Sequence, residues 1–342
     1  VVTTDWHTSD AQATVESNLQ QIRNWMDSPT TDMPAPSFMV VTGDFPNWNQ
    51  SQDTINNVLG TGFLWYPVIG NHEIDDGISN FNYVRDTMVP SLPYIVNYGP
   101  TGSVNTSYSW DYSNAHFVAI NAYWNGGTST GSDSATDGDI VPALKSWIDA
   151  DLVASAQAHR FAFVHEPAYP AHRHVGDSLN KYPTNRDAFI TTLNNHDVEV
   201  LFCGHTHYYE HDVAPEFPLG NVHQITNGPM RGTDGGTTIT YVLVDGSAAT
   251  YKVYYRAIGS PNFILQETWS IGGPPPASPP VAPTNLSAVA ASANRVDLSW
   301  ADNAENEESC EIERALTGAS GTFSFLGSVA ANVTTYSDTG LS

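Results

Sequence analysis

The stretch Trp65-Tyr66-Pro67-Val68-Ile69-Gly70-Asn71-His72-Glu73 shows the pattern on which most of this chain is built, a short apolar run that ends in polar side chains. Aromatic and β-branched runs of this length, bounded by Gly or Pro, predict buried strands. Further runs at 38–41, 161–164 and 198–202 lead into Gly43-Asp44, His165 and Gly204-His205-Thr206-His207, and Asp5-Trp6-His7 follows the first residues. Because open α/β sheets place their ligands beyond the strand ends, these polar blocks predict one shared site.

The side chains in these blocks predict a metal site. They supply Asp carboxylates, an Asn carbonyl and imidazoles without a thiolate cluster, a set that suits Zn, Mn, Fe or Co better than copper or iron–sulfur clusters. Two such ions close together would hold one phosphoryl group and turn a bridging water into a nucleophile near neutral pH. Glycines before Asp44, Asn71 and His205 are expected to let the backbone turn sharply. His205 and His207 alternate along an expected extended segment, so both would face one side.

His72 and Glu73 suit supporting roles in this site. His72 follows the candidate ligand Asn71 and is placed to donate to a phosphoryl oxygen or to protonate the leaving group. Glu73 is interpreted either as a carboxylate that supports the ligands from behind or as an ordinary solvated acid.

With all five blocks present in order, the chain resembles the calcineurin-like metallophosphoesterases, whose pattern is DxH, GD, GNH(D/E), H and GHxH. The resemblance spans about residues 1–272 and implies a four-layer α/β/β/α sandwich that holds two divalent or trivalent metal ions. It also implies catalysis by His72, which binds no metal, and by Asp44, beside which a metal-bridging hydroxide attacks phosphorus. The implied ligands are Asp5, His7 and His207 for one metal, Asn71, His165 and His205 for the other, and Asp44 as the bridge.

Within that superfamily the chain most resembles the purple acid phosphatases, through Gly70-Asn71-His72-Glu73-Ile74-Asp75 and the segment 108–117. Two positions depart from that branch. Asn47 stands where its tyrosine ligand is expected, and His7 stands where its first motif usually has Gly. A tyrosinate–iron(III) chromophore is therefore not expected, and the metals stay open among Zn, Mn and Fe.

Cations near these blocks are candidate substrate-binding residues. His172, Arg173 and His174 form a small cluster shortly after His165, and Arg231 lies in a Gly- and Pro-bounded turn. We expect His172, His174 and Arg231 to contact the phosphate or the leaving group, with an exposed loop as the alternative.

The charge balance restricts the partners of this chain. Its 36 acids against 12 Lys plus Arg give a formal net charge of −24. No basic stripe is present to neutralise a nucleic-acid backbone, so bulk nucleic-acid binding is excluded. Anionic substrates are repelled at long range, and their capture must depend on the local charge of the metals.

The cellular setting is inferred from composition. No apolar run reaches a membrane-spanning length, and Cys203 and Cys310 are expected to be free, small buried residues. The abrupt opening Val1-Val2-Thr3-Thr4 and the scarcity of Lys and Cys favour a processed bacterial protein that is secreted or periplasmic.

Periodicity predicts helices and strands consistent with an α/β class. Ser9 or Asp10 is expected to cap a helix that runs to Met26. The other expected elements are helices over 140–152 and 185–195 and strands over 115–121, 238–244, 249–255 and 264–270.

The chain is expected to divide into 1–273, the catalytic domain, a Pro-rich linker over 274–283, and 284–342. The last segment resembles a fibronectin type III module through Val296-Asp297-Leu298-Ser299-Trp300 and Thr335-Tyr336-Ser337-Asp338-Thr339. It is too short for the usual seven strands, so an incomplete all-β module is expected. Its expected strands are 286–290, 295–300, 311–315 and 323–328.

Three functions fit these observations. The first is a secreted phosphomonoesterase that acts on small-molecule phosphoesters. A phosphodiesterase or nucleotidase of the same fold shares the site chemistry, and only pocket shape would separate them. The third is a non-catalytic adhesion module whose C-terminal segment contacts a cell surface or polymer, a function that predicts at least one broken ligand block.

Overall fold

The structure is a computed structural model that describes residues 1–45, 47–76, 78–128, 137–272, 282–304, 309–315, 321, 323–339 and 341. Its contacts divide the chain into two compact units, Val1–Gly273 and Pro274–Ser342. Most of the expected linker, 274–281, lies outside the described residues.

The first sheet of unit 1 has the order β13-β12-β11-β1-β2-β3. Strands β1 (Val2–Thr3), β2 (Met39–Val41) and β3 (Trp65–Pro67) are parallel, with Val40 between Val2 and Tyr66 in register. The meander β11 (Thr237–Asp245), β12 (Ala248–Arg256) and β13 (Ile264–Gly272) continues the sheet antiparallel. Since parallel strands end at one edge, the polar blocks that follow β1, β2 and β3 emerge together.

The second sheet has the order β4-β5-β6-β7-β8-β10-β9. Its centre is parallel: β6 (Ala115–Ile120), β7 (His159–Val164), β8 (Val200–Cys203) and β10 (His223–Thr226). The chain leaves β7 at His165 and β8 at Gly204. The flanking strands are β4 (Ile95–Asn97), β5 (Tyr108–Tyr112) and β9 (Glu210–Asp212).

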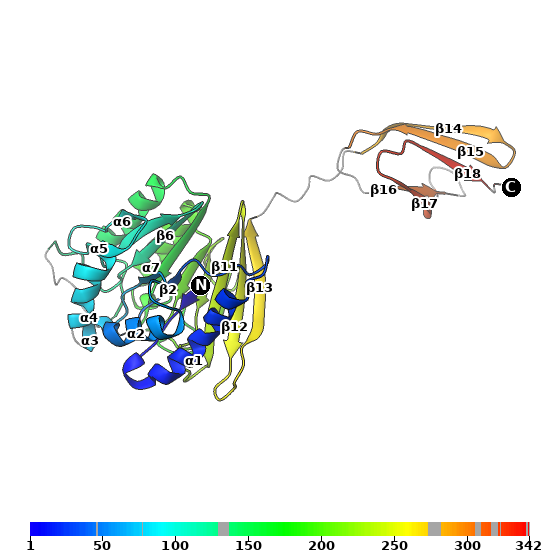
Figure 1. Cartoon of the computed structure of the whole chain (residues 1–342). Coiled ribbons are helices and arrows are strands. Elements are labelled where there is room, and N and C mark those ends of the chain that lie inside the picture. The colour runs from blue at the N-terminus through cyan, green and yellow to red at the C-terminus, as the bar shows by residue number, and fades with distance from the viewer. Residues whose placement is uncertain are drawn as a thin grey trace. The chain divides into compact units, whose positions relative to one another are not determined.

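Successive side chains of β7 point into two different hydrophobic clusters, which shows how the layers stack. Phe161 and Phe163 belong to the core cluster shared with the first sheet, whereas Ala162 and Val164 belong to a second cluster with the outer helices α6 (Pro142–Ala154) and α7 (Pro183–Asn195). On the far side of the first sheet, α1 (Thr8–Asp27) and α2 (Trp48–Val58) contact each other and contribute to the first cluster (Figure 1). The layers are therefore α/β/β/α. Each fully buried aromatic side chain stabilises this stack by about 2 kcal/mol.

The N-terminal helix departs from its predicted start. It begins at Thr8, because His7 occupies the N-cap position in a left-handed conformation (φ 41°) without a side-chain capping bond. Ser9 and Asp10 therefore lie inside the helix and not at its N-cap. The backbone of Ala11 is non-helical (φ −137°), so a kink interrupts the first turns.

Sequence reasoning missed the helix α2 because little apolar periodicity marks it. Only Ile55 among its apolar residues is fully buried, and Asn47 caps its start by accepting a hydrogen bond from Gln50 N at 3.2 Å. Short helical segments between β3 and β4, and one before α7, were missed as well. They are α3 (His72–Asp75), α4 (Ile78–Tyr83), a π-helix (Val84–Met88), α5 (Val89–Ser91) and a 3₁₀ turn (Leu179–Lys181).

Unit 2 is all-β, as predicted. One sheet has the order β14 (Thr284–Ser292), β15 (Arg295–Ala301), β18 (Thr335–Thr339), and the other pairs β16 (Ser309–Arg314) with β17 (Ser324–Ala330). Arg314 on β16 donates to both oxygens of Asp338 on β18 at 3.0 and 2.9 Å, which links the two sheets. Its identity as a fibronectin type III module stays a prediction.

Both cysteines are free, as expected; Cys203 is buried, but Cys310 is only half-buried. Among the described residues, no helix is both long and apolar enough to cross a membrane.

Candidate metal centre

Five polar residues at the strand exits have left-handed backbones. They are Asp5 (φ 50°), His7 (φ 41°), Asp44 (φ 57°), His205 (φ 69°) and His207 (φ 61°). L residues other than Asn and Asp rarely adopt this conformation, and it persists only where surrounding structure enforces it. The loops after β1, β2 and β8 are therefore folded to aim these side chains, at some cost in backbone energy.

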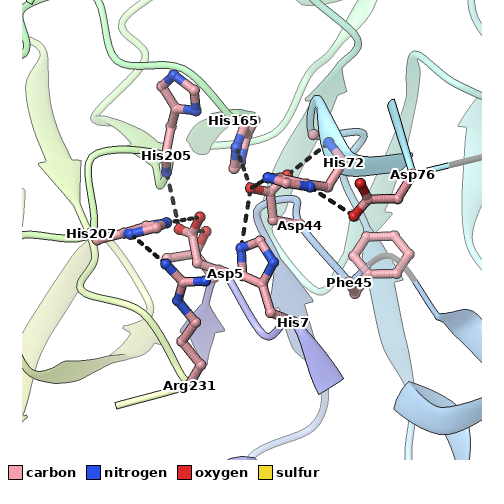
Figure 2. A network of polar contacts seen from close by, with 12 residues as sticks. Asp5, His7, Asp44, Phe45, His72, Asp76, His165, His205, His207 and Arg231 are labelled. Atoms are coloured by element: carbon pink, nitrogen blue, oxygen red, sulfur yellow. Dashed lines mark hydrogen bonds and ion pairs between the residues drawn. The ribbon is translucent and has the colours of Figure 1, made fainter. Parts of the chain in front are cut away.

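Asp5, His7, Asp44 and His207 converge on one point. Their ligand atoms all lie within 4.8 Å of one another, and all four residues are buried. His7 Nε2 is 3.5 Å from Asp44 Oδ2, and His207 Nε2 is 3.1 Å from Asp5 Oδ1 (Figure 2).

Next to these residues lie His165 and His205, and His205 N donates to Asp5 Oδ2 at 3.0 Å. His165 Nε2 is 3.3 Å from Asp44 Oδ2, and the rings of His165 and His205 lie 5.0 Å apart. The structure thus brings the predicted Asp and His ligands to one place, and Asn71 directly precedes His72, whose backbone N–H donates to Asp44 Oδ1 at 3.2 Å. This cluster is here named the Asp44 centre. It consists of Asp5, His7, Asp44, Asn71, His165, His205 and His207.

Five buried atoms in the Asp44 centre make no hydrogen bond, although three of them face another charged side chain of the centre at 3.1–3.5 Å. They are Asp5 Oδ1, His7 Nε2, Asn71 Oδ1, His165 Nε2 and His205 Nε2. Leaving one such atom unsatisfied costs about 1–3 kcal/mol, so a folded protein rarely gathers several without a compensating ligand. Each is an oxygen or imidazole nitrogen of the kind that binds divalent metals, and the donor set therefore fits a metal site.

The remaining atoms of these side chains are held in place. His165 Nδ1 bonds to Thr42 O at 2.7 Å, and Asp5 Oδ2 accepts from Thr4 Oγ1 at 2.8 Å and from His205 N at 3.0 Å. Such secondary hydrogen bonds fix ring orientation and tautomer at metal sites. They leave the unpartnered atoms pointing inward.

The electrostatics of the centre favour positive charge. Burial raises the pKa of Asp44, but His165, together with His7 and His72, outweighs burial and holds that pKa well below its usual value. Burial likewise raises the pKa of Asp5, but His207 brings it down to about 2. Burial lowers the pKa of His165, yet the Asp44 carboxylate raises it to about 10. In each case buried carboxylates and cationic groups stabilise one another, as a cation site requires.

Glu73 is fully buried behind the centre, so it is not a solvated acid. Its carboxylate accepts hydrogen bonds from the backbone N–H groups of Asp44 (3.0 Å), Phe45 (2.7 Å) and Gly70 (2.7 Å). Burial and the charge of Asp44 raise its pKa to about 8, although the backbone donors oppose this. Glu73 therefore ties the loops after β2 and β3 together.

The glycines of the blocks serve close packing more than turning. Only Gly43 has a positive φ (92°); Gly70 and Gly204 do not. A Cβ on Gly70 would lie 2.3 Å from Asp44 Oδ1, and one on Gly204 would lie 1.9 Å from Thr4 Oγ1. The prediction of sharp turns at all of these glycines was wrong at Gly70 and Gly204, where the lack of a side chain lets the loops touch.

The prediction of an extended GHTH segment was also wrong. Residues 204–208 form a loop beyond β8, in which His205 and His207 both have left-handed backbones. The His207 ring faces Asp5 (Figure 2), and the His205 ring lies 5.0 Å from the His165 ring.

His72 lies beside the centre at the start of α3. Its Nε2 is 3.9 Å from Asp44 Oδ2, its ring meets the His7 ring edge-on at 4.6 Å, and it is partly exposed. Its Nδ1 lies 2.8 Å from Asp76 Oδ2. Sequence reasoning missed Asp76, although the i, i+4 spacing from His72 on a short helix was a usable signal.

The candidate substrate-binding residues separate into two groups. The His174 ring lies 4.0 Å from the His205 ring, and Arg231 Nη2 is 3.1 Å from His207 Nδ1, so both border the centre. His172 instead pairs with Glu210 through Nδ1 (2.7 Å) and stacks on Tyr208. Arg173 and Asp234 also contact His207. Nothing in the sequence marked Asp234.

Comparison with known proteins agrees with this geometry. A sequence model of the calcineurin-like phosphoesterases matches residues 1–209, so the chain belongs to the calcineurin-like phosphoesterase family.

Individual relatives are distant. Purple acid phosphatase 22 of Arabidopsis thaliana is 27% identical over 158 residues, which cover 43% of this chain and 31% of that protein, so the match spans about a third of the relative's length. Among solved structures, GAP50, the anchor in the inner membrane complex of Plasmodium, superposes with a TM-score of 0.50 at 10% identity, covering 81% of this chain and 89% of GAP50. A Vps29 variant from Entamoeba histolytica gives a TM-score of 0.38 at 12% identity, covering 80% of this chain and 98% of Vps29.

Proposed function

We propose that this protein is a phosphomonoesterase that works with two metal ions at the Asp44 centre. The observation that carries the proposal is the set of buried oxygen and imidazole nitrogen atoms of the Asp44 centre that make no hydrogen bond. One group would consist of Asp5, His7 and His207 and the other of Asn71, His165 and His205, with Asp44 shared between them.

Bound metal ions of this kind polarise a phosphoryl group and supply a water of lowered pKa as nucleophile. The chain's own residues would then hold the ligand loops in place and protonate the leaving group. His72 presents Nε2 toward the centre while Asp76 accepts from Nδ1–H, so the protonated ring also carries Nε2–H and can donate it to a phosphoryl oxygen or to the departing alkoxide. Glu73 keeps the ligand loops fixed through its backbone contacts.

The first test is metal content together with activity. We expect about two metals per chain by elemental analysis, and hydrolysis of p-nitrophenyl phosphate that a chelator abolishes and added Zn, Mn or Fe restores. A higher rate on p-nitrophenyl phosphate than on bis-p-nitrophenyl phosphate supports a monoesterase, and the reverse ratio makes the protein a phosphodiesterase. A protein that stays inactive after metal addition contradicts both and favours a binding module.

A second test is His72→Ala. We expect turnover to fall by about 100-fold or more, the usual contribution of a positioned acid, while metal content and the melting temperature stay at wild-type values. The control is His196→Ala, because His196 follows α7 and pairs with Asp149 in the outer helix layer. Equal turnover in both variants would remove His72 from the mechanism.

We also propose that the protein acts outside the cytoplasm, on the strength of its formal net charge of −24 and its few cysteines. Fractionation of the producing cells tests this, and recovery only with the cytoplasm contradicts it.

A further inference from the structure

Two arginines from separate loops meet beside the Asp44 centre. Arg173 lies in the loop after β7, and Arg231 lies in the loop between β10 and β11. Arg231 Nη2 is 3.1 Å from His207 Nδ1 (Figure 2), and Arg173 Nη1 contacts the same nitrogen. Both guanidiniums lie 3.5 Å from Asp234 Oδ2.

The hydrogen-bonding capacity of His207 Nδ1 is already used. Asp234 Oδ2 lies 2.6 Å from this nitrogen and, being a carboxylate, can only accept, so Nδ1 carries the proton. Guanidinium N–H groups are donors too and cannot bond to a protonated nitrogen. Arg173 and Arg231 therefore point N–H donors at His207 Nδ1, which cannot accept a hydrogen bond from them.

The charges at this spot do not balance either. Among the described residues, one carboxylate, that of Asp234, lies within 4 Å of the two guanidiniums. The whole chain has 12 Lys plus Arg against 36 acids, so the convergence of two cations is unusual for this molecule. The side chains are accessible, 41% exposed for Arg173 and 24% for Arg231.

We propose that Arg173 and Arg231 form a subsite for a second anionic group of the substrate, and this rests on the function proposed above. The substrate class is a phosphomonoester whose leaving group carries a carboxylate or a further phosphate. Paired guanidinium donors match such groups in geometry and charge. Because Nε2 of His207 faces the Asp44 centre and Nδ1 faces the arginines, the two anionic groups must be joined by a short linker.

Paired substrates test the subsite. The full-length, metal-loaded protein is assayed for phosphate release from ethyl phosphate and from phosphoglycolate, which adds a carboxylate. We expect the wild type to favour phosphoglycolate in kcat/KM, and the double variant Arg173→Gln/Arg231→Gln to lose about 10- to 100-fold more on phosphoglycolate than on ethyl phosphate, as expected for charge-assisted hydrogen bonds. The control Arg23→Gln, on α1 and paired with Asp27, should keep the preference.

A binding measurement separates this proposal from the proposed function. Titration calorimetry compares ethylphosphonate with 3-phosphonopropionate, which again differ by a carboxylate. If the wild type binds 3-phosphonopropionate more tightly than ethylphosphonate and the double variant loses this difference, the subsite is supported. This holds even if neither ester is hydrolysed, because the absence of hydrolysis contradicts only the proposed enzymatic function. Equal binding of both phosphonates by the wild type, or equal losses on both by the double variant, overturns the subsite.

Discussion

At the residue scale, the centre depends on pairs in which one side chain fixes another. The His72–Asp76 contact is the simplest of these, since Asp76 Oδ2 accepts at 2.8 Å from Nδ1 and leaves Nε2 to face Asp44. The His207–Asp234 contact has the same form at 2.6 Å. In both pairs a carboxylate selects the tautomer of the imidazole.

Substitution of Asp76 tests the first pair. Asp76→Asn should lower kcat by about 10-fold or more, because an amide no longer stabilises a protonated imidazole, and it should move the acidic or basic limb of the kcat–pH profile while KM and metal content stay unchanged. Asp75→Asn is the matched control, because Asp75 is an exposed neighbour on α3. A kcat loss without any change in the pH profile would mean that Asp76 acts only on local structure.

At the element scale, a buried histidine links β5 and β6 to α6. His116 Nδ1 contacts Asp111 Oδ1 at 2.6 Å and Nε2 contacts Asp151 Oδ2 at 3.0 Å. Both ring nitrogens donate, so the ring is an imidazolium. Burial by itself lowers the pKa of His116, but the hydrogen bonds and charges of Asp151 and Asp111 outweigh it and raise the pKa.

This arrangement predicts a pH-dependent contribution to stability. A raised folded-state pKa means that the contribution is complete below the unfolded value of about 6.5 and is lost as the pH rises through the folded-state pKa. His116→Gln should therefore lower the free energy of unfolding by about 2 kcal/mol at acidic pH and by less at alkaline pH. Urea unfolding of both proteins across the pH range measures this, and a gap that widens with pH would contradict it.

The success of sequence reasoning also varied by element. The apolar runs of β2, β3, β7 and β8 marked buried strands, because their burial is nearly complete and leaves a continuous apolar signal. The helix α2 was missed, because most of its surface is polar and half-exposed. The first helix was found but its start was wrong, since His7 takes the N-cap position with a left-handed backbone and without a capping side-chain bond.

At the scale of the whole molecule, the two units have very different cores. Unit 1 contains both hydrophobic clusters. In the described part of unit 2, the buried apolar side chains are Trp300 and Ile312, while Leu286 is 71% exposed and Phe325 is 64% exposed. Unit 1 therefore buries enough apolar side chains to be stable by itself, whereas the described part of unit 2 buries few.

This contrast predicts the outcome of truncation. A protein that ends at Gly272 should keep the metal content and the p-nitrophenyl phosphate activity of the full chain, and its Tm should shift by less than about 3 °C, because no core cluster is cut. Residues 282–342 alone should give a broad, weakly cooperative transition. Loss of folding in the shorter protein would contradict the boundary expected at residue 273.

The sequence by itself determined which Asp, Asn and His side chains make up the candidate site, their order and their position at strand ends, because strand and motif signals are local. Only the tertiary structure decided which further residue holds each side chain or loop of the Asp44 centre in place. His207 and Asp234 are 27 positions apart, and Glu73 reaches Asp44 across 29 positions. Such pairs depend on the paths of loops over the sheet edge, and those paths are set by packing between distant segments, which no local pattern of residues encodes.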